Sequence, residues 1–447
     1  MLLRLIAENI KSFKNATEFN MFPSSKSQNH DNHKIVCGHT SVLRMGAIYG
    51  ANGAGKSNLI KLLHFLQTLV YMETLTKIAF IDGPSFKLDS QYTNKPSELA
   101  IEFYNRNRIF YYHIKFLGQE IITEELLLSQ KNKDVELFKR NDTDISINSK
   151  LIGKGISEQF KDALTRLVRP DMLLLSFLGK YYPNESPIVS NAYQWFTNKL
   201  NLLLPEYKFS FVPHLLDTDP HFAGLMNKLL PEMNTGINQI IVKKQLIDER
   251  DIKNNQWMQF KNEQLLQLIK IAKEHPNIPQ SLIFQNDIIN VVCENGNIYA
   301  KSLIVVHKSI DGSYTEFSIP NESDGTRRLI EFMPLIYNVI QNEAIYVVDE
   351  IERSLHPIMI KDIIRKISES ETAKGQLIFT THESCLLDQS IFRPDEIWFA
   401  QKDVEQATQL YPLSDFNIHK TANIENGYLD GRYGGIPFLS NLKDLHW

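Results

Sequence analysis

The glycine-rich stretch at residues 50–57, Gly-Ala-Asn-Gly-Ala-Gly-Lys-Ser, has residue types and spacing that point directly to chemistry. Four residues separate Gly50 from Gly55, and Lys56 and Ser57 follow at once, which is the spacing of a phosphate-binding loop. Glycines let backbone N–H groups turn inward around phosphate oxygens, and the next helix adds the partial positive charge of its N-terminus. Lys56 would neutralise the β- and γ-phosphates of ATP, and the Ser57 hydroxyl would ligate Mg²⁺.

The segments on either side of this loop fit the same interpretation. Residues 45–49 form a short apolar run typical of a strand, and residues 58–66 carry apolar side chains at helical spacing. Strand, glycine loop and helix are the context that phosphate binding requires, although a glycine-rich turn can match the pattern by chance. The residues expected to contact the nucleotide here are Gly50, Asn52, Gly53, Gly55, Lys56, Ser57 and Asn58.

A second candidate for the same site is an apolar run, residues 345–348, that ends in Asp349 and Glu350. Carboxylates at the end of such a strand lie at the edge of a sheet where ligands bind in α/β folds. Asp349 would hold the Mg²⁺ shell through water, and Glu350 would polarise the attacking water as general base. A solvated strand end is the alternative, and the phosphate loop in the same chain argues against it.

The residues that follow these acids resemble the ABC-type ATPase family, in the branch with SMC, Rad, RecF and OLD-like proteins. Residues 354–357, Ser-Leu-His-Pro, match a short loop of that family that reaches across a dimer interface. His382, after Thr380 and Thr381 at the end of the next expected strand, resembles the switch histidine that contacts the γ-phosphate. A strand-end histidine with a local hydrogen bond is the alternative for His382.

Residues 323–326, Ser-Asp-Gly-Thr, occupy the place of the family's signature loop. The resemblance implies that Ser323 and Gly325 contact the nucleotide bound by a second subunit. The usual pattern is Ser-Gly-Gly, and Asp324 replaces its first glycine here. Ser323 and the helix N-terminus could still donate to a γ-phosphate, whereas an ordinary N-cap turn is the alternative.

Residues 8–13, Glu-Asn-Ile-Lys-Ser-Phe, resemble the opening strand of SMC- and RecF-like ATPases. The resemblance implies that Lys11 touches phosphate and that Phe13 lines the base. A plain amphipathic strand is the alternative. The glutamine that ligates Mg²⁺ in this family should follow the first helix, and Gln91 is a candidate by position only.

The resemblance covers residues 1–65 and about 317–437 well and the middle of the chain loosely. The chain most resembles stand-alone ATPases of bacterial anti-phage and abortive-infection operons. These include the RloA and AbiL-type ATPases and the AriA ATPase of the PARIS systems, which it resembles most. This subgroup implies an ATPase sensor that dimerises on ATP binding and forms higher homo-oligomers. It further implies control of a separately encoded Toprim-type nuclease in response to a phage trigger protein.

Length, charge and cysteine content limit the number of domains and the classes of function that the chain could have. A chain of 447 residues suggests two or three domains or one elaborated domain. The formal net charge of −4 excludes a generally basic nucleic-acid binder. The three cysteines form no CxxC pair, which argues against a zinc module or a disulfide framework and fits a reducing cytosol. We expect a cytoplasmic location and no membrane association, because the N-terminus lacks signal-peptide character and no run approaches 18 apolar residues.

The expected fold is α/β, an ABC-type P-loop ATPase head with an antiparallel β subdomain and a compact, mainly helical insertion. The expected domains are residues 1–150 with the phosphate loop and β subdomain, 151–310 as a helical or mixed insertion, and 311–447 with the signature loop, catalytic acids and switch histidine. Strands are expected within 1–22, 98–104, 110–116, 121–128, 236–242, the hairpin 287–306, and 344–348, 376–380, 396–401 and 408–413. Helices are expected at 157–168, 193–204, 221–230, 255–274, from 324 onward and at 357–368.

Residues 23–40 are polar and are expected to form a surface loop, and the tail 428–437 an ordered loop. His30, His33 and His39 suggest a metal, but no cysteine or carboxylate stands at ligand spacing, so the loop is preferred. Residues 383–447 are too few for a nuclease domain of their own.

A DNA-repair or chromosome ATPase of the RecF/SMC type, which clamps DNA, is the alternative function. The sequence lacks the long coiled coil of SMC proteins, which weakens this alternative. DNA binding would also need a local basic stripe, for which the candidates are Lys243, Lys244, Lys253, Arg327 and Arg328.

Overall fold

The computed structural model describes residues 1–27, 29–77, 84–148, 158–247, 262–284, 287–419 and 422–436. The chain forms two compact units. Unit 1 comprises Met1–Pro205, Val339–Arg353 and Lys361–Trp447, and unit 2 comprises Glu206–Asn338 and Ser354–Ile360. These limits differ from the boundaries expected at 150/151 and 310/311, because the segment up to Pro205 contributes to the sheet of unit 1.

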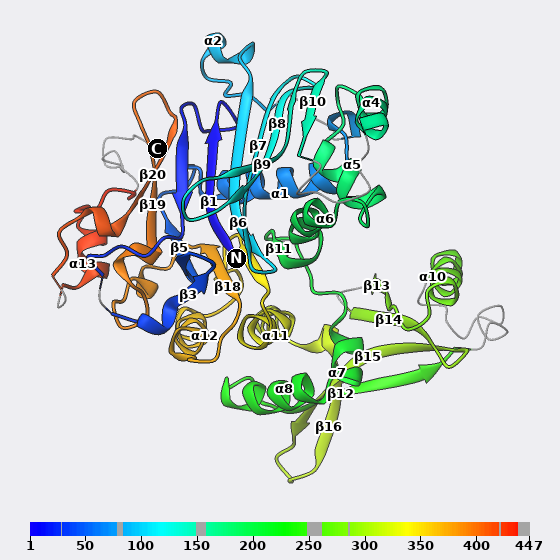
Figure 1. The fold of residues 1–447 in the computed structure, drawn as a ribbon. Coiled ribbons are helices and arrows are strands. Elements are labelled where there is room, and N and C mark those ends of the chain that lie inside the picture. The colour runs from blue at the N-terminus through cyan, green and yellow to red at the C-terminus, as the bar shows by residue number, and fades with distance from the viewer. Residues whose placement is uncertain are drawn as a thin grey trace, which may run out of the picture. The chain divides into compact units, whose positions relative to one another are not determined.

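Unit 1 is built on a six-stranded sheet with the order β11–β17–β18–β5–β19–β20 (Figure 1). The first five strands are parallel, and β20 is antiparallel to β19. The strands are β11 Leu200–Leu203, β17 Ile345–Val348, β18 Gln376–Thr380, β5 Met45–Tyr49, β19 Ile397–Lys402 and β20 Thr408–Pro412. Every residue of β5, β17 and β18 is buried, as expected of parallel strands covered on both faces. The loops that follow these three strands meet at one edge of the sheet.

The strand β11 differs from the helix expected over residues 193–204. The helix α6 ends at Gln194, a π-helical turn covers Trp195–Lys199, and β11 then pairs in parallel with β17. A short apolar run such as Leu-Asn-Leu-Leu fits a helix or a strand equally well by pattern. The free backbone groups at the edge of β17 decide the outcome, because they gain hydrogen bonds only from a strand.

A seven-stranded antiparallel sheet forms the predicted β subdomain of unit 1, in the order β10–β9–β8–β7–β6–β1–β2. The turns expected at residues 105–107 and 117–119 connect β6 to β7 and β7 to β8, so this part of the fold prediction is confirmed. The strands are β1 Leu2–Glu8, β2 Thr17–Asn20, β6 Ser97–Asn105, β7 Arg108–Leu117, β8 Glu120–Ser129, β9 Val135–Asn141 and β10 Asp144–Ile147.

The helix α1, Lys56–Met72, follows the glycine loop and supplies buried leucines to a core shared with both sheets. Gln376 at the start of β18 ties the two sheets together. Its side chain accepts from the Leu2 N–H at 2.7 Å and donates to the Leu2 and Leu43 carbonyls at 2.9 and 2.8 Å. The other helices of unit 1 are α2 Ser90–Thr93, α4 Glu158–Leu167, α5 Leu174–Tyr181, α6 Pro187–Gln194 and α13 Ile424–Leu429. The helix α12, Pro357–Glu369, lies largely in unit 1.

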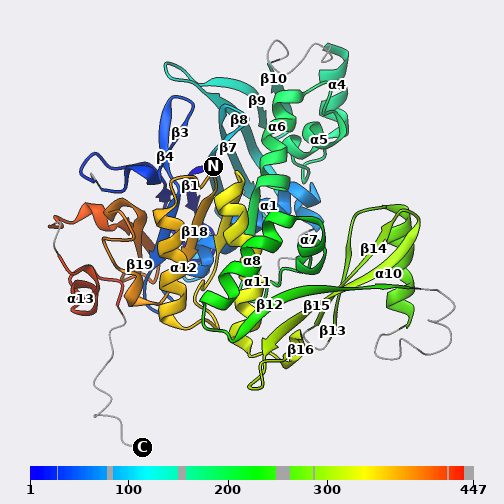
Figure 2. The same ribbon diagram turned by 90° about the horizontal axis from the view of Figure 1, so that it is seen from below.

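Unit 2 contains a five-stranded antiparallel sheet in which β15 pairs with β12, β14 and β16, and β13 pairs with β14 (Figure 2). The insertion is therefore more β-rich than the mainly helical one expected. The strands are β12 Ile237–Leu246, β13 Gln280–Phe284, β14 Asp287–Glu294, β15 Asn297–Lys308 and β16 Tyr314–Ser318. The helices are α7 Val212–Thr218, α8 Pro220–Glu232, α10 Asn262–Glu274 and most of α11 Asp324–Gln341. Residues 255–261 of the expected helix 255–274 lie outside the described residues.

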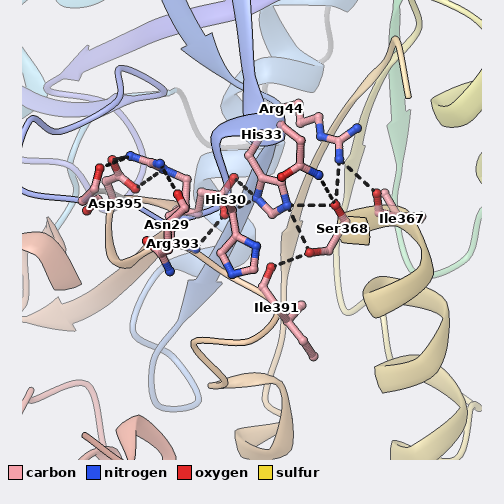
Figure 3. A network of polar contacts seen from close by, with 12 residues as sticks. Asn29, His30, His33, Arg44, Ile367, Ser368, Ile391, Arg393 and Asp395 are labelled. Carbon is pink, nitrogen blue, oxygen red and sulfur yellow. Dashed lines mark hydrogen bonds and ion pairs between the residues drawn. The ribbon is translucent and has the colours of Figure 1, made fainter. Parts of the chain in front are cut away.

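The segment 23–40 is wrongly predicted as a surface loop. It contains a 3-10 turn at Asp31–His33 and the strand β3, Lys34–Cys37, which pairs with β4, Thr40–Leu43. His33 is fully buried, and its Nδ1 lies 2.9 Å from both carboxylate oxygens of Glu396. Figure 3 shows the His33 ring with its contacts to Ser368. The carboxylate partner that the local sequence lacks thus comes from 363 residues away.

His33, Ser368 and Glu396 have the connectivity of a hydrolytic triad, but their contacts make them structural. His33 Nε2 lies 3.0 Å from the Ser368 hydroxyl, which donates to the Ile391 carbonyl at 2.7 Å. All three side chains are fully buried, so no substrate reaches the serine. Arg393 completes the cluster through a bidentate ion pair with Asp395, at 2.9 and 2.8 Å. The network ties the 24–33 segment to the end of α12 and to the connection between β18 and β19.

Replacing His33 with Ala is expected to destabilise unit 1 by about 2–3 kcal/mol, because it leaves the buried Glu396 carboxylate short of a donor. The measurement is the midpoint of thermal unfolding followed by circular dichroism. His39→Ala is the matched control, since His39 is exposed at the turn of the β3–β4 hairpin that follows His33. Equal melting temperatures for the two variants would contradict the structural role assigned to His33.

Candidate functional site

The glycine loop joins β5 to α1 and has backbone conformations that require glycine. Gly50, Gly53 and Gly55 have φ values of 153°, 78° and 106°. A Cβ at Gly50 would lie 2.4 Å from the Ala400 carbonyl oxygen, and one at Gly55 would lie 2.1 Å from the Thr408 hydroxyl. The first and last glycines are therefore fixed by close neighbours, whereas Gly53 at the exposed tip has open space around it.

Lys56 lies at the first position of α1 and turns back across the loop. Its ammonium donates to the carbonyl oxygens of Gly50 at 2.6 Å and Ala51 at 3.2 Å. Only 5% of the residue is exposed. Burial lowers the pKa of Lys56 to about 8, and the carboxylates of Glu352, Asp349 and Glu350 oppose that shift. A phosphate group arriving at the loop would thus meet a buried cation and stabilise its charged form.

Ser57 and Asp349 are brought together from α1 and the end of β17. The Ser57 hydroxyl donates to Asp349 Oδ1 at 3.1 Å, and Asp349 is almost fully buried. A hydroxyl and a carboxylate are the hard oxygen ligands that Mg²⁺ prefers. The two residues expected to hold Mg²⁺ therefore fit such an ion by position and by donor type.

Thr380, at the end of β18, was not singled out by sequence reasoning, yet it links both acids. Its hydroxyl donates to Asp349 Oδ1 at 2.6 Å and accepts from the Glu350 backbone N–H at 2.8 Å. Glu350 has a φ of 51°, a left-handed conformation that non-glycine residues rarely adopt. The only signal in the sequence is the place of Thr380 at the end of a strand, next to His382.

His382 follows β18 at the same sheet edge, and its backbone N–H donates to Glu352 Oε1 at 2.7 Å. Its side chain is exposed. Partial burial lowers the pKa of the His382 ring, and the Lys56 ammonium lowers it further, while the carboxylates of Glu352, Glu350 and Asp349 raise it. These charges place His382 in one electrostatic site with the loop lysine and the acids.

The N-terminal segment contacts the loop through Ser12, and the contact expected between Lys11 and phosphate stays a prediction. The Asn58 amide donates to the Ser12 hydroxyl at 2.7 Å, and the Thr408 hydroxyl donates to it at 2.8 Å. Lys11 is exposed, and burial of its stem and the ammonium groups of Lys61 and Lys87 lower its pKa.

Two further expectations concern side chains of unit 1. Phe13 is 1% exposed in the core, so its expected contact with a nucleotide base is not supported. Gln91 is exposed on α2, where its backbone N–H donates to Asp89 at 2.9 Å, and no described contact joins it to the acids.

The loop with Ser323 and Gly325 lies in unit 2 at the start of α11. The Ser323 hydroxyl accepts from the Thr326 N–H at 3.1 Å, so it caps the helix. Asp324 forms an ion pair with Arg327. A Cβ at Gly325 would lie 3.1 Å from the Ser354 carbonyl oxygen, so this position suits glycine.

The tail packs against the glycine loop from behind. Tyr428 and Tyr433 stack on Phe399 with ring centroids 5.6 and 6.0 Å apart, and the Tyr428 hydroxyl donates to the Gly435 carbonyl at 3.2 Å. A Cβ at Gly435 would lie 3.7 Å from the Gly50 Cα. The expected ordered loop 428–437 thus starts in the last turn of α13, and Gly435 packs against the start of the glycine loop. Pro437 lies outside the described residues.

Three further findings concern metal ligands, membrane spans and cysteines. Within the described ranges, no cluster of three or more His, Cys, Asp or Glu side chains is arranged to hold a metal ion. None of the helices that the structure describes is both long and apolar enough to span a bilayer. Cys37 and Cys293 are buried free thiols, and Cys385 is a partly buried one.

A family model described as "AAA domain, putative AbiEii toxin, Type IV TA system" matches residues 47–388 of the chain, which include the glycine loop, the acids and His382. No curated protein matches the sequence significantly.

Three solved structures of SMC heads are similar. One, an SMC head bound to the C-winged helix domain of ScpA, is 13% identical with a TM-score of 0.40 and covers 92% of this chain and 97% of its own. The head domain from Thermotoga maritima is 11% identical with a TM-score of 0.33, covering 92% and 98%. A Pyrococcus furiosus head with an extended coiled coil, bound to the C-terminal domain of ScpA, is 14% identical with a TM-score of 0.36, covering 92% and 96%.

Proposed function

The chain belongs to the family of AAA domains described as putative AbiEii toxins of type IV toxin–antitoxin systems, and from this membership we propose that it is an ATP-hydrolysing switch in bacterial anti-phage defence. The observation that supports ATP hydrolysis is the convergence of Lys56, Ser57 and Asp349 at the carboxyl ends of β5 and β17. We expect it to act in the cytoplasm, like the AriA and RloA ATPases that the sequence resembles.

In the proposed reaction the glycine loop holds the phosphates with backbone N–H groups, and Lys56 releases the Gly50 and Ala51 carbonyls to contact the β- and γ-phosphates. Ser57 and Asp349 would hold Mg²⁺, which neutralises phosphate charge when bound. Glu350 takes a proton from the attacking water as general base. The Thr380 hydroxyl fixes the backbone of Glu350 and the carboxylate of Asp349, so that both acids keep one geometry. His382 contacts the γ-phosphate.

ATP binding is proposed to close a homodimer in which Ser323 and Gly325 of one subunit meet the nucleotide of the other. Ser323 caps α11, and the N-terminus of an 18-residue helix carries the positive partial charge that attracts phosphate. Closure or hydrolysis would then hold or release a separately encoded Toprim-type nuclease, with a phage protein as trigger and a higher homo-oligomer as scaffold.

The alternative, a RecF/SMC-type ATPase that clamps DNA, finds less support. Three of the five candidate basic residues are engaged in ion pairs: Lys244 with Glu294 and Asp217, Arg327 with Asp324, and Arg328 with Glu331. Lys243 is exposed, and it forms no ion pair with a described residue. Paired cations contribute little to a field that attracts DNA. Lys253 lies outside the described residues.

The test is a native purification of the Glu350→Gln variant from cells that carry its neighbouring genes, with ATP and Mg²⁺, followed by mass spectrometry and light scattering. A stoichiometric nuclease in a homo-oligomeric assembly is the expected result. A dimer bound to DNA without a protein partner would overturn the defence proposal in favour of the clamp. Lys56→Ala, prepared in the same way, controls for association that does not depend on ATP.

A further inference from the structure

The Glu352 carboxylate has one oxygen in use and one without a partner. Glu352 follows the two acids of β17, and its Oε1 accepts the His382 backbone N–H at 2.7 Å. Its Oε2 is buried and has no hydrogen-bond partner among the described residues. A buried carboxylate oxygen without a donor is costly, so a donor that arrives in another state of the protein would be favoured.

The His382 ring can supply such a donor, because the backbone of the same residue already contacts Glu352. Neither ring nitrogen forms a hydrogen bond with a described residue, and the side chain is exposed. Because the backbone of His382 is already bonded to Glu352, rotation of the His382 side chain alone changes the place of the ring relative to that carboxylate. Glu352 thus has an unpaired acceptor oxygen, and His382 has an unpaired ring donor. The hydrogen bond from the His382 backbone to Glu352 already holds the two residues together.

The electrostatic order of the site agrees with this pairing. Among the carboxylates that raise the pKa of the His382 ring, Glu352 has the largest effect, ahead of Glu350 and Asp349. Glu352 also leads the same three acids in raising the pKa of Lys56. The third acid, and not the two at the end of the strand, therefore has the strongest electrostatic coupling to both His382 and the loop lysine.

We propose that Glu352 is a positioning residue of the ATP site and that its Oε2 accepts a hydrogen bond from the His382 ring when ATP is bound. The inference rests on the proposed ATP hydrolysis. A carboxylate that accepts from one ring nitrogen fixes the tautomer and the orientation of an imidazole. The other ring nitrogen then faces the γ-phosphate and the attacking water. Glu352 thereby couples the end of β17 to the residue that follows β18.

The first test is an NMR titration of the His382 ring in the full-length protein, with and without Mg²⁺ and a non-hydrolysable ATP analogue. His382→Ala identifies the signal. Glu352→Gln keeps an oxygen for the His382 N–H and removes the negative charge, so the ring pKa should fall by roughly one unit with the analogue bound and by less without it. Glu383→Gln removes a neighbouring acid that is not among the charges with the largest effect on the ring, and it should shift the ring pKa much less than Glu352→Gln does in either state.

A difference between wild type and Glu352→Gln that is the same with and without the analogue would overturn the pairing. So would an unchanged ring pKa. Glu352→Asp, which keeps the charge, should retain most of the ring pKa and guards against a folding defect in the Gln variant. These readouts need no turnover, so a protein that hydrolyses no ATP would refute the proposed function while the ring titration still decides the pairing.

A double-mutant cycle on ATP turnover provides the second test. Glu352→Gln and His382→Ala should each lower kcat by about tenfold with little change in KM, and the double variant should lose no more than His382→Ala alone. Losses that multiply would mean that Glu352 acts independently of His382, which contradicts a positioning role.

Discussion

Replacing Lys56 with Ala is expected to weaken ATP binding by about 100-fold or more. Charge-assisted hydrogen bonds contribute roughly 1.5–3 kcal/mol each, and each 1.4 kcal/mol is about a factor of ten in affinity. Lys56 would supply at least two such bonds to the β- and γ-phosphates. Lys11 and Lys61 are exposed residues, whereas the Lys56 ammonium is buried within the loop itself. The measurement is the Kd of a fluorescent ATP analogue in the presence of Mg²⁺.

The structure also defines the control for this variant. Lys56 bridges the Gly50 and Ala51 carbonyls, so its loss could loosen the loop as well as remove a phosphate ligand. Thermal unfolding of the variant separates these effects, since a loosened loop alone leaves most of the core of unit 1 intact. Lys61→Ala removes an exposed lysine from the same helix and should bind ATP normally. ATP affinity that is unchanged in Lys56→Ala would refute the assignment of the loop.

The parts of the site that could be predicted from sequence are those whose chemistry is local. Residues 50–57 carry their glycines, lysine and serine within one turn of chain, and the φ values confirm why Gly50 and Gly55 must be glycine. The acids 349–350 follow a buried strand and lie where the ends of parallel strands place ligand-binding residues. The roles assigned to these residues remain predictions.

The parts that could not be predicted depend on which strands become neighbours. Thr380 meets Asp349 because β18 lies beside β17, and the two residues are 31 positions apart. Ser12 and Thr408 meet beneath Gly55 although 396 positions separate them. No periodicity encodes such pairings, since they follow from sheet order. Glu352 was passed over because it stands in the middle of an acidic, polar loop, where its side-chain direction has no signature in the sequence.

Local pattern also misled where two structures compete for the same run of residues. Leu200–Leu203 follows a helical segment, yet it forms a strand because it pairs with β17 at the edge of the sheet. The 23–40 segment is polar enough for a loop, yet His33 finds Glu396 and becomes buried. In both cases a distant partner supplied hydrogen bonds that local propensity does not contain.

Replacing Glu350 with Gln is expected to lower kcat for ATP hydrolysis by about 100-fold to 1,000-fold while ATP binding persists. General-base catalysis typically contributes 10²–10⁴-fold, and an amide cannot take the proton of the attacking water. Gln is close to Glu in size, and the backbone N–H of this residue keeps its bond to the Thr380 hydroxyl at 2.8 Å. Asp349 and Ser57 are untouched, so Mg²⁺ and the phosphates should bind as before.

The measurement is single-turnover hydrolysis of ATP, which reports the chemical step without product release. Glu369→Gln, an exposed acid on α12, is the matched control and should hydrolyse ATP at the wild-type rate. Binding of the ATP analogue by the Glu350 variant should remain within about threefold of wild type, a change of less than 1 kcal/mol. A variant that neither binds nor hydrolyses would instead indicate that the left-handed backbone at residue 350 fails to form.

Full turnover by Glu350→Gln would remove this residue as general base and leave one other acid in position. Glu352 is the carboxylate with the strongest influence on Lys56 and His382, and it has a buried oxygen without a described partner. That outcome would therefore indicate that Glu352, two residues after Glu350, is the general base. The two roles of Glu352 make different predictions for Glu352→Gln: a loss of about tenfold in kcat if Glu352 only positions His382, and of about 100-fold or more if it is the general base.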